Sequence, residues 1–182
     1  MYLYLVVILA VLAIVDLVVG VSNDAVNFLN SAIGSKAISF KKIMIIASVG
    51  IFIGAVFSSG MMEVARKGIF VPSEFFFDEI MIIFLAVMIT DILLLDFFNT
   101  IGMPTSTTVS IVFELLGAAV VMALIKISSI PEQTFADIWQ YINTDKATEI
   151  VWGIILSVLI SFTIGALVMW LSRLVFTFHY KE

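Results

Sequence analysis

The chain has 182 residues and a mean hydropathy of +1.20, and 62% of its residues are hydrophobic, against about 45–50% in soluble domains. It has no cysteine, which excludes disulfides, thiolate metal sites and a cysteine nucleophile, and its net charge of −5 argues against nucleic acid as a partner. We therefore expect an integral membrane protein, with residues 1–182 forming a single transmembrane domain.

Five segments are predicted to cross the bilayer as helices, because a crossing needs about 20 mostly apolar residues and lipid offers no partner to an open backbone. They are residues 2–21, 43–62, 80–98, 105–125 and 150–172. The predicted fold class is an all-α membrane protein of about five transmembrane helices with broken or re-entrant segments. A second copy of a five-helix unit would enter the membrane from the opposite side, so the count also suits one half of an inverted-repeat transporter.

The distribution of lysine and arginine predicts the orientation, because these residues favour cytoplasmic loops. The first loop holds Lys36, Lys41 and Lys42, and the tail holds Arg173 and Lys181. Residues 127–148 are acidic on balance and are expected to form an external loop with a short surface helix around 135–142. We expect a plasma or inner membrane protein with its N-terminus outside and its C-terminus in the cytoplasm.

Three acidic residues, Asp16, Asp91 and Glu114, fall inside predicted spans. Ionised acids are costly in lipid and usually face a bundle interior or water. One interpretation is that they are coupling acids, which bind the coupling ion or a proton. The other is that they are protonated or hydrogen-bonded structural acids, or lie on the seam with a second half.

The first polar cluster is the stretch GVSNDAVNFLNSAIGS, residues 20–35. Its polar residues are spaced by three or four and share one helix face: Asn23, Asp24, Asn27, Asn30 and Ser31. A carboxylate and amide oxygens on one stripe suit a hard cation such as sodium. Gly20 and the asparagines are expected to interrupt the helix and free backbone carbonyls. The alternative is a polar helix end in the headgroup region, capped by Asn23 or Asp24.

The second polar cluster is GMPTSTTVS, residues 102–110. Glycine and proline interrupt the chain, and Thr105, Ser106, Thr107 and Thr108 are expected in the first turn of the next helix. Unpaired N–H groups and the positive end of the helix dipole make such a turn a site for an anion. The alternative is an ordinary Ser or Thr cap.

The two clusters together suit a carrier that couples a cation to an anion. A cation beside the anion would partly neutralise its charge, so each ligand would strengthen binding of the other. This interpretation requires the two clusters to converge on a shared pocket.

Both stretches resemble signature motifs of the inorganic phosphate transporter family, the sodium- or proton-coupled phosphate symporters. The family motif N-D-V-A-N followed by G-T/S-x-x-G-S is represented here by NDAVNFLNSAIGS, and G-x-P-V-S-T-T-H by GMPTSTTVS. The chain departs from these patterns at four positions, where it has Asn30 for glycine, Val109 for histidine, and Phe113 and Glu114 for small residues.

The resemblance implies roles for individual residues. Sodium would be the coupling ion and would be bound by Asp24, Asn23 and Asn27. A proton could take the place of sodium as the coupling ion. No other cofactor is expected. Phosphate would be held by Ser106, Thr107, Thr108, Thr105, Asn27 and Ser31. Other expected partners are membrane lipid and either a second repeat half or another copy of the chain.

The predicted function is a secondary active transporter, or half of one, that moves inorganic phosphate with a cation. The resemblance covers one copy of a unit that family members usually contain twice. Two alternatives are a non-transporting membrane assembly subunit and a carrier of another tetrahedral oxyanion such as sulfate. An enzyme is not expected, because the single histidine, His179, lies near the C-terminus and no catalytic constellation accompanies it.

Overall fold

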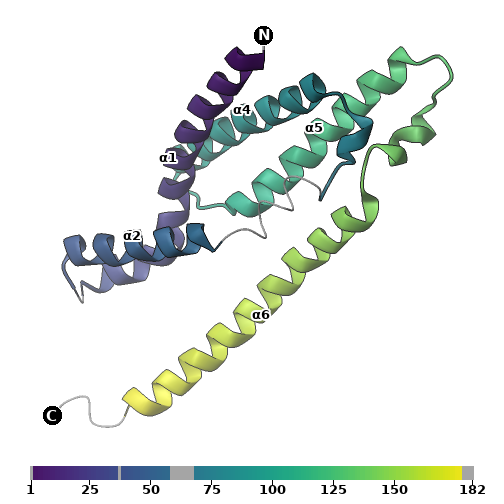
Figure 1. Ribbon diagram of the computed structural model, residues 1–182. Coiled ribbons are helices and arrows are strands. Elements are labelled where there is room, and N and C mark those ends of the chain that lie inside the picture. Colours follow the sequence, from purple (N-terminus) through teal and green to yellow (C-terminus); the bar gives the residue numbers. More distant parts are fainter. Residues whose placement is uncertain (1, 37, 58–67, 178–182) are drawn as a thin grey trace. The chain divides into compact units, whose positions relative to one another are not determined.

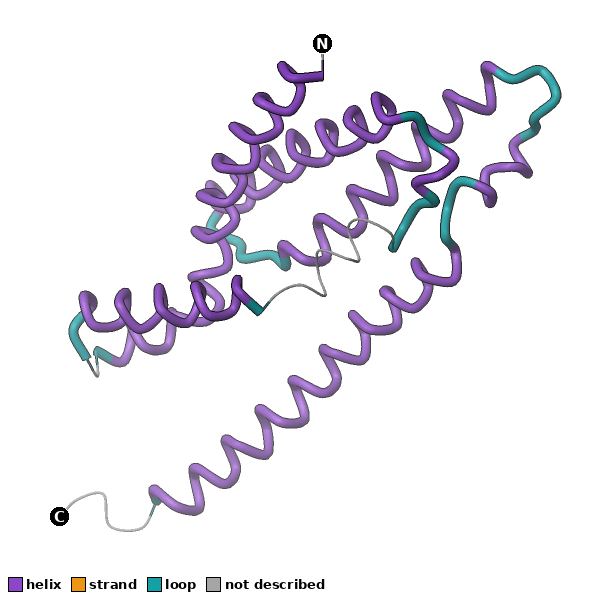
Figure 2. Tube along the Cα trace, viewed as in Figure 1, coloured by secondary structure: helices purple, strands orange, loops and turns teal. Residues whose placement is uncertain are grey.

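The computed structural model describes residues 2–36, 38–57 and 68–177. Contacts divide the chain into two units, Met1–Asn143 and Thr144–Glu182, and each is described by itself. The regular structure of the described residues is helical (Figure 2), apart from one isolated antiparallel bridge between Phe70 and Ile142. The prediction of an all-α protein is thus confirmed, whereas the prediction of a single domain stays a prediction.

Among the described residues of the first unit, four segments form α-helices and two form short 3₁₀ helices. They are α1 (Tyr2–Ser35), α2 (Phe40–Val56), η1 (Pro72–Glu74), α4 (Phe77–Ile101), α5 (Thr107–Ser129) and η2 (Phe135–Gln140), and Figure 1 shows their arrangement. The second unit contains α6 (Thr144–Phe176). Four described helices are long and apolar enough to cross a membrane, namely α1, α4, α5 and α6. Helix α2 has 17 residues, and the last part of the predicted second span, residues 58–62, lies outside the described residues.

The prediction of an interrupted helix in the first polar cluster is wrong. Helix α1 continues through residues 20–35 and ends at Ser35. The helix bends instead, and Figure 1 shows its two halves running in different directions. Side chains reach its backbone in this region: Ser22 Oγ donates to Val18 O at 2.7 Å, and Asn99 Nδ2 donates to Val19 O at 3.3 Å. Such inserted hydrogen bonds are a known cause of helix bending.

The core of the first unit lies where α4 packs against α1 and α5. The apolar residues of α4 and α5 that face this core are Ile83, Val87, Leu95, Val112, Leu115, Ala119 and Ala123. Ala119 and Ala123 are fully buried and four residues apart on α5. Small residues at this spacing let two helix backbones approach closely. This packing fixes the register of α4 and α5, which share the turn that carries the second polar cluster.

The loop before α4 and the segment after α5 pair with each other. Val71 N donates to Tyr141 O at 2.9 Å, and Asn143 N donates to Ile69 O at 3.0 Å. Ile69, Phe70 and Tyr141 are almost completely buried there. The expected short helix around residues 135–142 is present as η2. These contacts join the start of α4 to the end of α5.

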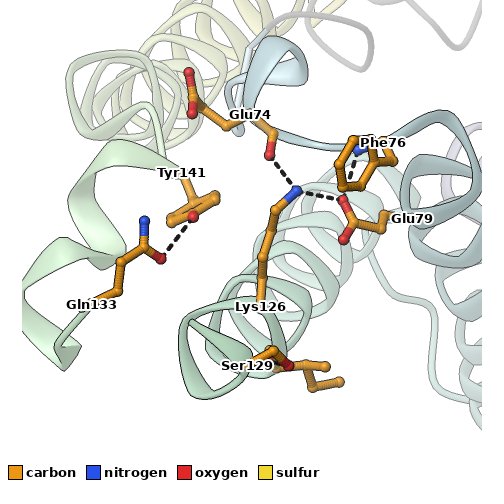
Figure 3. Close-up of polar contacts among 8 residues, drawn as sticks. Glu74, Phe76, Glu79, Lys126, Ser129, Gln133 and Tyr141 are labelled. Atoms are coloured by element: carbon orange, nitrogen blue, oxygen red, sulfur yellow. Dashed lines mark hydrogen bonds and ion pairs between the residues drawn. The ribbon is translucent and has the colours of Figure 1, made fainter. Parts of the chain in front are cut away.

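Lys126 makes a second connection between the same helix ends (Figure 3). Its Nζ donates at 2.8 Å to both Glu79 Oε2 and the Glu74 carbonyl oxygen, and it lies 4.2 Å from the centre of the Phe76 ring. Glu79 Oε2 also accepts from Phe76 N at 2.6 Å, which satisfies a free N–H at the start of α4. One ion pair therefore caps α4 and holds the last turn of α5.

Replacing Lys126 with methionine is expected to lower the free energy of unfolding by about 2 kcal/mol, because partly buried Glu79 loses its charged donor. Denaturant titration in mild detergent measures this loss. The matched control is Lys146→Met, which removes the exposed Lys146–Glu149 pair of α6 and should change stability little. Equal effects of the two substitutions would contradict the assignment.

Candidate functional site

The two polar clusters are in direct contact in the first unit. Thr107 Oγ1 donates to Asp24 Oδ2 at 3.0 Å, and the Thr105 N–H donates to Asn23 Oδ1 at 3.0 Å. Asn27 Nδ2 also donates to Thr105 O at 3.4 Å. The polar face of α1 therefore lies against the start of α5, so the expected convergence of the two clusters is present.

The turn between α4 and α5 presents the second cluster to α1. Gly102 ends α4 in the left-handed region with φ 69°, and its N–H donates to Asn99 O at 3.2 Å. Residues 103–106 are not helical, so α5 begins at Thr107, and Ser106 caps it by accepting from Val109 N at 3.4 Å. The cap expected as the alternative is therefore present. Thr105, expected within the first turn, precedes the helix and exposes its backbone groups to Asn23 and Asn27.

Asn23 is the most constrained residue of the first cluster, with a side chain that is only 1% exposed. Its Oδ1 accepts from Thr105 N, and its Nδ2 donates to Asn99 Oδ1 at 2.8 Å. Because Asn23 lies in the interior of α1, the alternative in which Asn23 or Asp24 caps a helix end is wrong. This geometry makes Asn23 a residue that holds α1, α4 and α5 together.

Sequence reasoning missed the part that Asn99 plays in this site. Asn99 accepts from Asn23 and donates to Val19 O at 3.3 Å, so it links the bend of α1 to the last turn of α4. The available signal was its position three residues before Gly102, which places an amide beside the second motif.

The remaining predicted site residues lie around this contact with differing exposure. Asp24 and Thr107 are half-buried, while Ser106, Thr108, Asn27, Asn30 and Ser31 are exposed. A carboxylate has about four acceptor positions, so the Thr107 hydroxyl leaves Asp24 able to bind a cation as well. The exposed hydroxyls form an open surface at the start of α5, where an anion can approach.

The three acidic residues come together in the interior of the first unit, one each from α1, α4 and α5. Asp91 is 2% exposed and interacts electrostatically with Asp16. Glu114 interacts electrostatically with both aspartates and accepts a hydrogen bond from Ser110 Oγ at 2.8 Å. Within the described residues, no three His, Cys, Asp or Glu side chains are grouped so that they could hold a metal ion.

A groove of about 450 Å³ extends from the hydroxyl-rich turn to Glu114. The residues that line it include Thr90 and Leu94 of α4, Thr105 and Ser106 before α5, and Ser110 and Glu114 on α5. One end of the groove thus offers hydroxyl groups, and the other offers a carboxyl group. The arrangement places a region for an anion beside a carboxyl group that can exchange a proton.

Comparisons with known proteins point to one family. The profile described as "Phosphate transporter family" matches residues 20–181. Among curated proteins, the chain is 32% identical over 150 residues to "Putative phosphate permease TK2061" from Thermococcus kodakarensis. This alignment covers 81% of the present chain and 33% of the relative. The chain is also 33% identical over 165 residues to a "Putative phosphate permease" from Helicobacter pylori, and that alignment covers 88% of the present chain and 28% of the relative.

The chain thus spans about a third of the length of the curated relatives it matches. No solved structure gives a significant match. The profile match includes both polar clusters, all of α4 and α5, and α1 from residue 20 onward. From this match and its long apolar helices, we conclude that the chain is an integral membrane protein that belongs to the phosphate transporter family.

Proposed function

We propose that the chain forms part of a secondary transporter that moves inorganic phosphate across the membrane together with a cation, which we take to be sodium. The observation that carries this proposal is the direct contact between Asp24 on α1 and Thr107 at the start of α5. It brings a carboxylate suited to a cation next to a helix start suited to an anion.

The proposed phosphate site consists of donors that carry no charge. These are the hydroxyl groups of Thr105, Ser106, Thr107 and Thr108 and the side chains of Asn27 and Ser31, with help from the N–H groups of the first turn of α5. Most of these side chains are exposed and can therefore reach a ligand. Neutral donors bind an anion less strongly than arginine does, which suits a carrier that must also release it.

The proposed sodium site is centred on Asp24, with Asn27 as a further ligand and Asn23 holding the geometry. Asn27 Nδ2 already donates to Thr105 O, which leaves its amide oxygen for a cation. Thr107 donates its single hydroxyl hydrogen to Asp24, so it can donate to phosphate only when a cation bound at Asp24 displaces that hydrogen bond. Binding of sodium and phosphate would then be coupled, and each would raise the affinity for the other.

We further propose that a second repeat half, or another copy of the chain, covers the exposed side of this site. The support is the exposure of Ser106, Thr108 and Ser31 beside a half-buried Asp24, since a carrier must enclose its substrate. The distribution of lysine and arginine supports an orientation with the first loop and the C-terminus in the cytoplasm, and with the N-terminus and the segment 127–148 outside. We propose that the chain forms one domain and lies in a plasma or inner membrane.

Uptake of radiolabelled phosphate into proteoliposomes tests the function, using the chain in the assembly purified from its native membrane. Phosphate should accumulate when sodium is higher outside, and excess sulfate should compete weakly. Strong competition by sulfate would favour a carrier of another oxyanion. Stable assembly without phosphate binding, or no uptake with either a sodium or a proton gradient, would instead favour a non-transporting subunit.

Replacing Ser106 and Thr107 together by alanine is expected to raise the KM for phosphate at least about tenfold. A hydrogen bond to a charged ligand contributes about 1.5–3 kcal/mol, and two such donors are lost. Initial uptake rates over a range of phosphate concentrations measure the change. Thr163→Ala on α6, whose hydroxyl donates to Leu159 O, is the matched control and should leave KM unchanged.

A further inference from the structure

The acidic group of Asp16, Asp91 and Glu114 has far too few donors for three ionised carboxylates. Oxygen atoms of all three are buried and lack a hydrogen-bond partner in the described part of the chain: Asp16 Oδ1, Asp91 Oδ1 and Glu114 Oε2. The one donor among the described residues that bonds to the group is Ser110 Oγ, which binds Glu114 Oε1. Three negative charges would be left nearly uncompensated.

The charges that surround the group add to this problem. The titratable groups that neighbour one another are all acidic, namely Asp16 from α1, Asp91 from α4 and Glu114 from α5. Lys126 is 12 residues from Glu114, about three turns further along α5, and pairs with Glu79. A buried carboxylate with neither a cation nor a donor takes up a proton.

The proximity of Asp16 and Asp91 points to the same ligand. Two neighbouring carboxyl groups in a buried site are stable together when one of them carries a proton that it can share with the other. Asp91 is 2% exposed and its Oδ1 is unpartnered, so it points into the group without another role.

We propose that Asp16, Asp91 and Glu114 form a proton-binding site inside the first unit, separate from the Asp24 region. The geometry places this site next to the proposed phosphate region. Glu114 lines the same groove as Thr105 and Ser106, and Ser110 lies between them and donates to Glu114. Glu114 is therefore the member of the group that adjoins the proposed phosphate region.

Proton binding itself does not depend on the proposed transport function, whereas its coupling to phosphate does. Infrared spectroscopy of the purified chain in lipid nanodiscs detects protonated carboxyl groups through their C=O stretch. We expect this signal at neutral pH in the wild-type chain, a marked loss in Asp91→Asn and in Glu114→Gln, and no change in Asp96→Asn. Asp96 is the matched control because it is an exposed aspartate on the same helix as Asp91.

The substitutions chosen keep the size of each side chain, and circular dichroism checks that the helices persist. A second readout is the pH dependence of thermal unfolding. Protons held by the folded chain and released on unfolding make stability fall as pH rises, so Asp91→Asn should flatten this dependence. Identical infrared signals in all four proteins, or loss of the signal on adding sodium at constant pH, would overturn the proposal.

Uptake measurements separate this proposal from the transport function. In proteoliposomes that transport phosphate, Glu114→Gln should change the pH profile of uptake and leave the KM for sodium unchanged. A chain that gives the carboxyl signal but never binds phosphate would refute the proposed function and leave the proton site intact. Transport with no carboxyl signal in the wild-type chain would refute the proton site and leave the proposed function intact.

Discussion

Asn23→Ala is expected to lower the free energy of unfolding by roughly 1–3 kcal/mol and to abolish phosphate binding at the same time. Asn23 is 1% exposed and joins three segments, through bonds to Thr105 N and Asn99 Oδ1. Truncation leaves the Thr105 N–H without its acceptor and Asn99 without its donor. Because the Thr105 backbone then loses its anchor on α1, the start of α5 should move away from Asp24.

Denaturant titration in mild detergent measures the stability, and equilibrium dialysis with labelled phosphate measures the binding. Asn30→Ala is the matched control, since Asn30 is exposed on the same helix, and it should affect stability by less than about 0.5 kcal/mol. If Asn23→Ala were as stable as Asn30→Ala, Asn23 would not hold the three helices together.

Asp24→Asn is expected to lower the apparent affinity for sodium at least about tenfold, which corresponds to about 1.4 kcal/mol. The substitution keeps an oxygen that can accept from Thr107 Oγ1 and removes the negative charge. The local structure should therefore survive while the cation loses its charged ligand. The sodium dependence of initial uptake rates, at saturating phosphate, measures this effect.

Thr107→Val provides the complementary control, because it keeps the charge of Asp24 and removes the hydrogen bond at 3.0 Å. We expect this variant to retain sodium dependence but to bind both ligands more weakly, since the two clusters are no longer held together. If Asp24→Asn transported phosphate with unchanged sodium dependence, the coupling ion would have to bind elsewhere.

The helices themselves could be predicted well from the sequence. The predicted spans at 80–98 and 105–125 agree with α4 (Phe77–Ile101) and α5 (Thr107–Ser129), because hydropathy reports the apolar surface that lipid or the core requires. The extra turn at the start of α4 depends on Glu79 capping the Phe76 N–H, which hydropathy does not report. The end of α4 follows from Gly102, whose φ of 69° glycine adopts without strain.

The course of α1 could not be predicted in the same way. Glycine and asparagine have low helix propensity, and this favoured an interruption near Gly20. A tertiary contact outweighs that preference, since Asn99 of α4 donates to the Val19 carbonyl oxygen at this point. The contacts that define the site join residues 76 to 83 positions apart, and a single sequence carries no signal for such pairs. The two motifs indicated that their residues belong together, but not which atoms meet.

Helix α1 is one continuous helix that carries residues of both ion-binding regions proposed for this chain. Asp16 lies on one side of the bend, Asp24 lies on the other, and the bonds to Val18 and Val19 fall between them. A continuous helix transmits rotation along its axis, so any straightening at this hinge must shift one carboxylate relative to the other. Proton binding at the acidic group and ligand binding beside Thr107 would then both act on the conformation of α1. No other segment would be needed to link the two regions.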